Sequence, residues 1–123
     1  MSVLIDTNII IDYLRNHPAA LAFIGGLRGK PRVSVVSIAE LYAGASSTAE
    51  EARIERLLGG SILLSVTPEI ARAGGQHMKH FQPSHGLDDL DALIAATAEH
   101  HGLELATLNV KHFPMFEKLK AAY

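Results

Sequence analysis

Near the start of the chain stands the sequence Val3-Leu4-Ile5-Asp6-Thr7-Asn8, in which three apolar residues run directly into an acid. An apolar run without polar alternation is typical of a strand that is buried on both faces, as in a parallel sheet. The charge of Asp6 comes where such a strand must end. We therefore expect a carboxylate at the carboxyl edge of a buried strand.

Strand-like and helix-like segments alternate along the rest of the chain. Further strands are predicted over residues 33–36, 61–66 and 103–107, helices over 9–14, 19–27, 38–45, 49–58, 68–81 and 90–101, and a loop over 83–86. Ser37 is expected to cap one helix, with Glu40 in capping-box spacing, and Gly102 to end another. Residues 113–123 are expected to be helical or irregular. The alternation predicts a single α/β domain over residues 1–123, with a mostly parallel sheet and helices on both faces.

The composition excludes several classes of protein. With 48% hydrophobic residues among 123, the chain can bury a core, and without cysteine it has no disulfide, zinc–thiolate site or cysteine nucleophile. The net charge of −2 differs from the strongly basic balance of a general nucleic-acid coat. Charge interrupts the longest early apolar run, so we expect a soluble cytoplasmic protein and no membrane partner.

Polar side chains follow or adjoin the predicted strands. Asp6 closes the first strand, Glu40 lies one helical turn past the second, Asp91 begins an Ala-rich helix, and Asn109 follows the fourth strand. In parallel sheets the carboxyl ends of the strands gather ligands at one edge. Several carboxylates without cysteine form an oxygen-rich site that suits Mg²⁺ or Mn²⁺ rather than zinc or copper. Such an ion polarises a phosphate oxygen and activates water, which is the chemistry of phosphodiester hydrolysis.

Four segments carry a resemblance to a known family, in the order and at the spacings typical of it. They are Met1-Ser2-Val3-Leu4-Ile5-Asp6-Thr7-Asn8, Ser37-Ile38-Ala39-Glu40-Leu41, Asp91-Ala92-Leu93-Ile94-Ala95-Ala96-Thr97-Ala98 and Thr107-Leu108-Asn109-Val110-Lys111-His112-Phe113. Together they resemble the PIN-domain family, in particular the VapC-type toxins of toxin–antitoxin modules. The resemblance covers nearly the whole chain and implies a three-layer α/β/α PIN-like fold with four to five strands in its central sheet.

The resemblance also implies an activity and partners. It implies an endoribonuclease that uses Mg²⁺ (or Mn²⁺) and a metal-activated water to hydrolyse tRNA, rRNA or mRNA. A cognate VapB-like antitoxin would inhibit it, with an apolar groove between the early helices receiving the antitoxin and an antitoxin arginine entering the acidic cavity. The groove candidates are Ile10, Ile11, Leu14, Ala39, Tyr42 and Ala43. The resemblance further implies a homodimer.

The three invariant acids of the family map onto Asp6, Glu40 and Asp91, which are the expected metal ligands. A fourth acidic position follows the last core strand in most relatives. Here that position holds Asn109, so an amide replaces the carboxylate. An amide oxygen still ligates a cation or orients water, but one negative charge is missing, which argues against a tightly held second metal.

Five further residues are candidates for a supporting role. Thr7 is expected to hold water or phosphate, and Thr107 to tether the acids through hydrogen bonds. Asn8 is read either as part of the site or as a helix cap, with the cap preferred. Asp88 is expected to cap the helix that carries Asp91. His112 replaces an Asp of many relatives and either contacts phosphate or Mn²⁺ or is a surface histidine at a helix start.

Alternatives from other functional classes remain at this stage. The basic residues expected around the site are Arg15, Arg28, Lys30, Arg32 and Lys111, which either dock RNA phosphates or only solubilise the surface. A PIN-fold binding module with lost or weak cleavage is conceivable because of Asn109. A receiver-like phosphoacceptor domain shares the length and the acidic site, but residues 61–67 offer no phosphoacceptor Asp.

Overall fold

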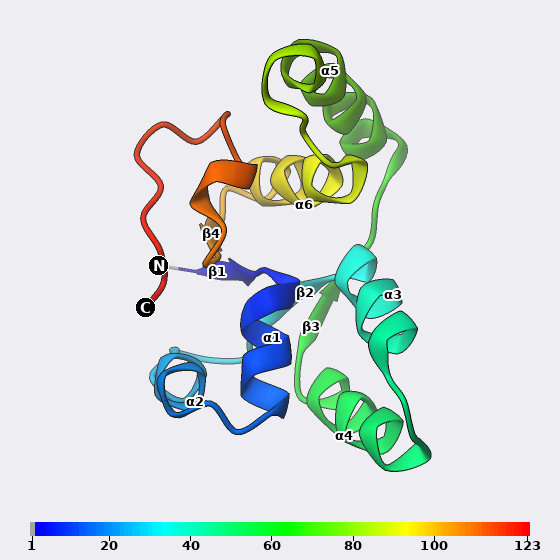
Figure 1. The fold of residues 1–123 in the computed structure, drawn as a ribbon, viewed down its shortest axis with the longest axis vertical. Coiled ribbons are helices and arrows are strands. Elements are labelled where there is room, and N and C mark those ends of the chain that lie inside the picture. Colours follow the sequence, from blue (N-terminus) through cyan, green and yellow to red (C-terminus); the bar gives the residue numbers. More distant parts are fainter. Residues whose placement is uncertain (1) are drawn as a thin grey trace.

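The computed structural model describes residues 2–123 and shows a four-stranded sheet with helices around it (Figure 1). In chain order its elements are β1 (Val3–Ile5), α1 (Thr7–Leu14), α2 (Pro18–Gly25), β2 (Arg32–Ser34), α3 (Val35–Gly44), α4 (Thr48–Gly59), β3 (Ile62–Leu64), α5 (Pro68–His85), α6 (Asp89–His100), β4 (Glu104–Ala106) and a 3₁₀-helix (Val110–His112). None of the helices in this range has the length and apolar character needed to cross a bilayer.

The sheet is parallel throughout, with strand order β3-β2-β1-β4. Leu4 of β1 lies opposite Leu105 of β4 on one side and Arg32 of β2 on the other. The Asp6 N–H extends the β1–β4 pairing by donating to the Ala106 carbonyl at 2.8 Å. The predicted α/β class with a parallel sheet is confirmed, and the strand number is four within the described residues.

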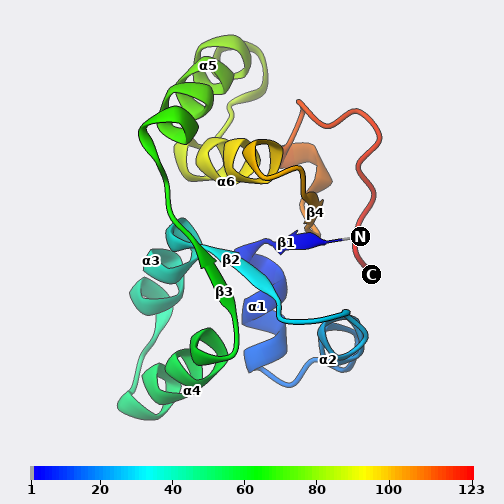
Figure 2. The same ribbon diagram turned by 180° about the vertical axis from the view of Figure 1, so that it is seen from behind.

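The two faces of the sheet are covered by different helices. Leu4 and Leu105 pack with Ile94, Ala95 and Ala98 of α6 on one face. The alternate strand residues Ile5, Val33 and Ala106 pack on the other face with α1 and α4, through Ile9, Ile10 and Ile54. Figures 1 and 2 show α5 and α6 on one side of the sheet and α1, α2 and α4 on the other. This explains why β1 reads as a continuous apolar run: both of its faces are buried.

The expected cap of α3 was wrong by three residues. Ser34, not Ser37, has extended backbone and accepts the N–H of Val36 through its side chain at 3.1 Å, so β2 ends at Ser34. The β-branched residues Val35 and Val36 favour a strand, but a capping serine overrides that weak preference. Ser37 therefore lies inside α3, where it is fully buried. Glu40 does not form the expected capping box with Ser37.

The boundaries of α5 and of the last segment also differ from expectation. α5 continues through Pro83 to His85 and ends at Gly86, whose φ of 61° is left-handed and whose N–H bonds the Gln82 carbonyl. Proline near the last turn removes only one of the helix's hydrogen bonds, so the predicted loop at 83–86 was wrong. Gly102, at φ 62°, follows α6 as expected. Residues 113–123 are irregular.

Two neighbouring glycines of α5 provide a test of the packing between α5 and α6. A Cβ added at Gly74 would lie 2.8 Å from Leu93 Cδ2 of α6, whereas one at Gly75 would meet nothing within 4 Å. Gly75→Ala should raise the free energy of unfolding by about 0.5–1 kcal/mol through helix propensity. Gly74→Ala should gain less or lose, because Leu93 must move. Thermal denaturation of both variants checks this, and an equal gain at both positions would contradict the close contact.

Candidate active site

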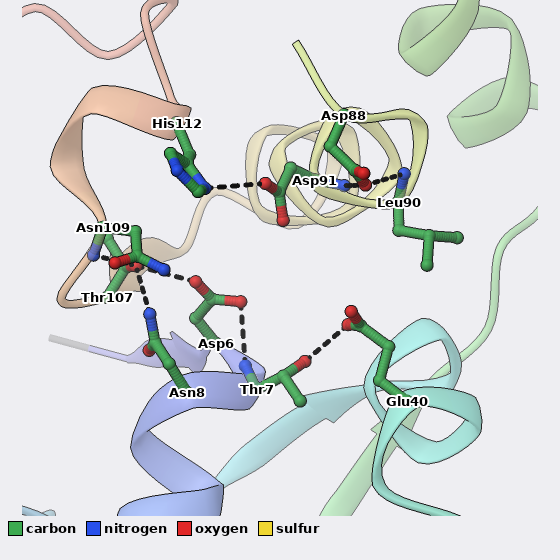
Figure 3. Close-up of polar contacts among 10 residues, drawn as sticks. All are labelled: Asp6, Thr7, Asn8, Glu40, Asp88, Leu90, Asp91, Thr107, Asn109 and His112. Carbon is green, nitrogen blue, oxygen red and sulfur yellow. Dashed lines mark hydrogen bonds and ion pairs between the residues drawn. The ribbon is translucent and has the colours of Figure 1, made fainter. Parts of the chain in front are cut away.

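The candidate acids come together at the carboxyl edge of the sheet. Asp6 follows β1, Glu40 lies in the second turn of α3, which begins where β2 ends, and Asp91 lies in the first turn of α6. Thr107 follows β4. Figure 3 shows these side chains around one space between α1, α3, α6 and the 3₁₀-helix. Parallel pairing of β2, β1 and β4 explains the arrangement, since neighbouring parallel strands end at the same edge.

Asp6 is a buried carboxylate, 4% exposed, and both of its oxygens accept hydrogen bonds. The Thr7 N–H donates to Oδ1 at 2.8 Å, which makes Asp6 the cap of α1. The Thr107 hydroxyl donates to Oδ2 at 2.7 Å. Burial raises the pKa of Asp6 above its ordinary value, although both hydrogen bonds favour the ionised form. The side chain is therefore fixed in place, with its charge only partly compensated.

Glu40 is held by a chain of hydroxyl groups. The Thr7 hydroxyl donates to Glu40 Oε1 at 2.7 Å and lies 2.8 Å from the Ser37 hydroxyl. Because Thr7 has a single hydroxyl proton and the carboxylate takes it, Ser37 is the donor in the second contact. Sequence reasoning missed this role of Ser37, which it had assigned to capping. The spacing of Ser37 and Glu40, three apart on one helix face, was the available signal.

Asp91 is flanked by a helix cap and a histidine. Asp88 caps α6 as expected, because its Oδ1 accepts the N–H groups of Leu90 at 2.8 Å and Asp91 at 3.3 Å. The His112 Nδ1 lies 3.3 Å from Asp91 Oδ2. His112 begins no helix; it ends the 3₁₀-helix and is more than half exposed. His112 is thus a surface histidine as expected, but the expected position at a helix start was wrong.

The electrostatics of Asp91 reflect crowding of negative charge. Burial, followed by the charges of Asp6 and Asp88, raises the pKa of Asp91 to about 6; Glu40 adds to this and His112 opposes it. An ordinary carboxyl of this type ionises near 3.8. A raised pKa caused by neighbouring carboxylates means that the ionised acids repel one another at neutral pH. A cation between them would relieve that repulsion.

The two asparagines lie at the rim of the same site. The Asn109 backbone N–H donates to the Thr107 hydroxyl at 3.0 Å, and its side chain is exposed. Asn8 Nδ2 lies 3.4 Å from the Thr107 hydroxyl oxygen, while Asn8 Oδ1 is buried without a partner among the described residues. Asn8 does not cap α1, because Asp6 does. The preferred interpretation of Asn8 as a cap was therefore wrong.

A cavity of about 320 Å³ joins the candidates. Every supporting or catalytic candidate except Thr107 lines it, together with two apolar residues: Asp6, Thr7, Asn8, Ile11, Glu40, Asp88, Leu90, Asp91, Asn109 and His112. Thr107 is fully buried behind Asp6. Residues as far apart in the chain as Asp6 and His112 thus line the same cavity. The apolar residues Ile11 and Leu90 were not anticipated as part of it.

The donor set of the cavity fits a hard divalent cation. Carboxylate and amide oxygens predominate, and the raised pKa of Asp91 indicates uncompensated negative charge. Between residues 2 and 123, no three acidic or histidine side chains converge closely enough to ligate one ion together as they stand. A shared ion would therefore need side-chain movement, for which Glu40 and Asp91 are partly exposed while Asp6 is buried.

Two of the five basic residues expected around the site, Arg15 and Arg32, do not line the acidic cavity but lie at other cavities. Arg32 is the first residue of β2 and lies at the amino edge of the sheet, beside Ser2 and His101. Arg15 ends α1 and lines a neighbouring cavity instead. Lys111 lies in the 3₁₀-helix next to His112. The assignment of Arg32 to the site edge was wrong. β2 begins at Arg32, one residue before the predicted strand, and it is the opposite, carboxyl end of β2 that reaches the site.

Comparisons with known proteins find relatives of this chain in sequence and in fold. A family model described as PIN domain matches residues 3–118. The chain is 44% identical to Ribonuclease VapC10 of Mycobacterium tuberculosis, covering 98% of this chain and 92% of the relative. It is 40% identical to Ribonuclease VapC19 of the same organism, covering 98% of both. Among solved structures, a toxin–antitoxin complex from Klebsiella pneumoniae superposes with a TM-score of 0.85 at 26% identity, covering 100% of this chain and 98% of that one.

Neutralising Asp91 should stabilise the cation-free protein. Because the pKa of Asp91 is about 6 in the fold and near 3.8 when exposed, the stabilisation from its protonation is complete below about pH 4 and is lost as the pH rises through 6. Asp91→Asn should therefore raise the free energy of unfolding at pH 7.5 by about 1–2 kcal/mol, somewhat less than the pKa shift alone implies, because an Asp in the first turn of a helix is itself stabilising. Denaturant unfolding from pH 4 to 8 measures this.

The matched control for that measurement is Asp89→Asn, which removes an acid from the same helical turn outside the cavity. It should not stabilise the protein at any pH. A gain from Asp91→Asn that is equally large at pH 4, or a similar gain from Asp89→Asn, would contradict the burial and charge repulsion that raise the pKa of Asp91.

Proposed function

Since the chain belongs to the PIN-domain family and, within it, to the VapC-type ribonucleases, we propose that it hydrolyses RNA phosphodiester bonds with a divalent cation held by Asp6, Glu40 and Asp91. The observation that carries this proposal is the single cavity lined by all three acids. Mg²⁺ is the expected ion, with Mn²⁺ as the substitute of similar ligand preference. As a VapC-type toxin, the protein acts in a toxin–antitoxin module.

The proposed cation would bind three acids that the protein positions in different ways. Asp6 is fixed by the Thr107 hydroxyl and the Thr7 N–H, and Glu40 by the Thr7 hydroxyl. The contacts of Asp6 hold its oxygens in place before the ion arrives and so reduce the cost of ordering the site, whereas Glu40 would exchange its Thr7 contact for the ion. When bound, the ion supplies charge neutralisation at a phosphate oxygen and lowers the pKa of water.

Two residues complete the proposed site from the segment after β4. The Asn109 amide provides a neutral oxygen or N–H group at the rim, where it can orient water or a ribose hydroxyl. The His112 imidazole, 3.3 Å from Asp91, is exposed enough to donate to a substrate phosphate. Lys111 beside it adds a positive charge for RNA docking, which gives affinity without sequence preference. The RNA class, tRNA, rRNA or mRNA, stays a prediction from the family.

Cleavage should depend on each of the three acids. Asp6→Asn, Glu40→Gln and Asp91→Asn should each lower the rate of RNA cleavage in Mg²⁺ or Mn²⁺ by about a hundredfold or more, because each removes a charged ligand of the ion. Asp89→Asn is the matched control and should keep wild-type activity. The assay uses antitoxin-free protein and a mixture of structured RNAs.

The contrary outcome has a specific meaning. If the wild type cleaves no RNA in either metal and still binds an antitoxin, the chain is a binding module that keeps the PIN fold, a reading favoured by Asn109 in place of the fourth acid. If Asp89→Asn lowers the rate as much as Asp91→Asn does, the cavity acids are not the ion's ligands.

A second cavity supports an antitoxin-binding groove. It measures about 300 Å³, lies between α1, α3 and α4, and has the apolar residues Ile11, Leu14, Leu41 and Ile54 in its wall. Ile11 and Glu40 also line the acidic cavity, so the two spaces adjoin. Of the expected groove residues, Ile11 and Leu14 line it, whereas Ile10 is core and Ala39, Tyr42 and Ala43 lie outside the wall. We assign the groove to the apolar side chains of a VapB-like antitoxin, acting on a homodimer as in the family.

The adjoining cavities predict competition between metal and antitoxin. An antitoxin arginine that enters from the groove would reach Glu40 and place its charge where the cation binds. Raising Mn²⁺ from zero to millimolar should therefore weaken antitoxin binding several-fold in wild type and have no such effect in Asp91→Asn. Titration calorimetry checks this. Antitoxin affinity that is independent of Mn²⁺ would exclude an arginine in the acidic cavity.

A further inference from the structure

The last residues of the described chain pack against α1 and α2. The Tyr123 hydroxyl donates to Asp12 Oδ2 of α1 at 2.7 Å. Its ring centroid lies 5.7 Å from that of His17 and 6.2 Å from that of Phe23. Burial and the contact with Asp12 raise the pKa of Tyr123 to about 12, so the phenol remains a donor at neutral pH. Tyr123 is thus anchored to the helix that Asp6 caps.

The neighbouring residue is bonded to the back of the acidic site. The Ala122 N–H donates to the Thr107 carbonyl at 3.0 Å, and Ala122 packs against the core cluster beneath α1. The Thr107 hydroxyl in turn donates to Asp6 Oδ2. Two hydrogen bonds therefore connect residue 122 to the carboxylate at the centre of the cavity. Figure 1 shows the segment after the 3₁₀-helix passing outside β4 and ending close to the N-terminus.

The Thr107 hydroxyl has further partners, since it accepts the Asn109 N–H and lies 3.4 Å from Asn8 Nδ2, but the Thr107 carbonyl depends on the C-terminal segment. On its N-terminal side Thr107 follows the Ala106 carbonyl, which accepts the Asp6 N–H, whereas residues 107–109 on its C-terminal side are irregular. Among residues 2–123 the Thr107 carbonyl accepts only one backbone hydrogen bond, from Ala122. The Thr107 carbonyl and the Thr107 side chain are attached to the same Cα. A bond that fixes the carbonyl therefore also restricts the side-chain hydroxyl. We expect that loss of the bond frees the peptide plane of this carbonyl to rotate and loosens the contact between the Thr107 hydroxyl and Asp6.

We propose that Ala122, anchored by Tyr123, is a positioning element of the active site: its N–H fixes Thr107 and, through Thr107, the orientation of the Asp6 carboxylate. The inference rests on the proposed function, in which Asp6 is a ligand of the divalent ion. It extends that function to a segment beyond the last family motif. Ala122 and Tyr123 do not line the acidic cavity and contact no reacting group.

The test removes the N–H without shortening the chain. Ala122→Pro should weaken Mn²⁺ binding about three- to tenfold, less than the roughly 10–100-fold expected for loss of a direct partner of a metal ligand. Raising Mn²⁺ should restore the cleavage rate in Ala122→Pro but not in Asp6→Asn, since only the orientation of the ligand is affected. KM for RNA should be unchanged at saturating metal. Calorimetry and initial rates measure these quantities.

Two controls separate this effect from disturbance of the chain. Ala121→Pro adds the same ring one residue earlier, where the N–H has no acceptor among the described residues, and should bind Mn²⁺ as wild type does. Tyr123→Phe should weaken Mn²⁺ binding through loss of the anchor, whereas Tyr13→Phe, on the same helix that carries Asp12, should not. Equal weakening by both proline variants, or none by Ala122→Pro, would overturn the proposal.

Amide hydrogen exchange distinguishes failure of the proposal from failure of the proposed function. In metal-free protein, Ala122→Pro should speed exchange at residues 107–109 relative to Ala121→Pro. If the wild type neither binds Mn²⁺ nor cleaves RNA while this exchange difference is present, the nuclease function fails and the structural link stands. If the wild type binds and cleaves but exchange at 107–109 is unchanged, the link itself is wrong.

Discussion

A buried carboxylate at the end of a buried strand is the constraint on which the rest of the structure depends. Asp6 cannot turn to solvent, because β1 is covered on both faces and Asp6 itself is 4% exposed. An ionised carboxylate without partners in that position would cost several kcal/mol. Its two oxygens are therefore given to the first N–H of α1 and to the Thr107 hydroxyl. The bond from the Thr7 N–H caps the start of α1, and the bond from the Thr107 hydroxyl attaches the segment after β4. The hydrogen bonds that stabilise the Asp6 carboxylate thus position two chain segments.

These bonds leave the negative charge of the cavity uncompensated, and that is the property a metal site needs. Asp6, Glu40, Asp88 and Asp91 line one space, and burial with mutual repulsion raises the pKa of Asp91 to about 6. Part of the folding free energy from the two core clusters is thus offset at this edge of the sheet. In the proposed metal site, a bound cation would release this repulsion, and that release would increase the affinity.

The sequence predicts more of this arrangement than is usual for a site built from distant segments. The alternation of elements indicated the parallel α/β fold, and Asp6 was placed correctly because an apolar run ending in an acid is unambiguous. Glu40 was found at the edge even though its cap was misassigned, since the cap shift from Ser37 to Ser34 left Glu40 on α3. What could not be predicted were contacts that depend on strand order and side-chain direction, such as the Thr7–Glu40 bond and the exclusion of Asn8 from capping.

Asn109 stands where most members of the family carry a fourth acid, and the effect of this difference depends on the charges that remain in the cavity. With Asn109 in the fourth position, the segment after β4 brings an amide and His112 to a cavity whose acids come from β1, α3 and α6. An additional carboxylate there would raise the pKa of Asp91 further, and a protonated acid is a poor ligand. His112 instead lies against Asp91 and opposes that rise. Under the proposed function, the substitution would lower the number of charges available to a second ion while keeping Asp91 closer to its ionised form for the first. The proposed site would then favour one ion held by three acids, with the segment after β4 acting on the substrate rather than on the metal.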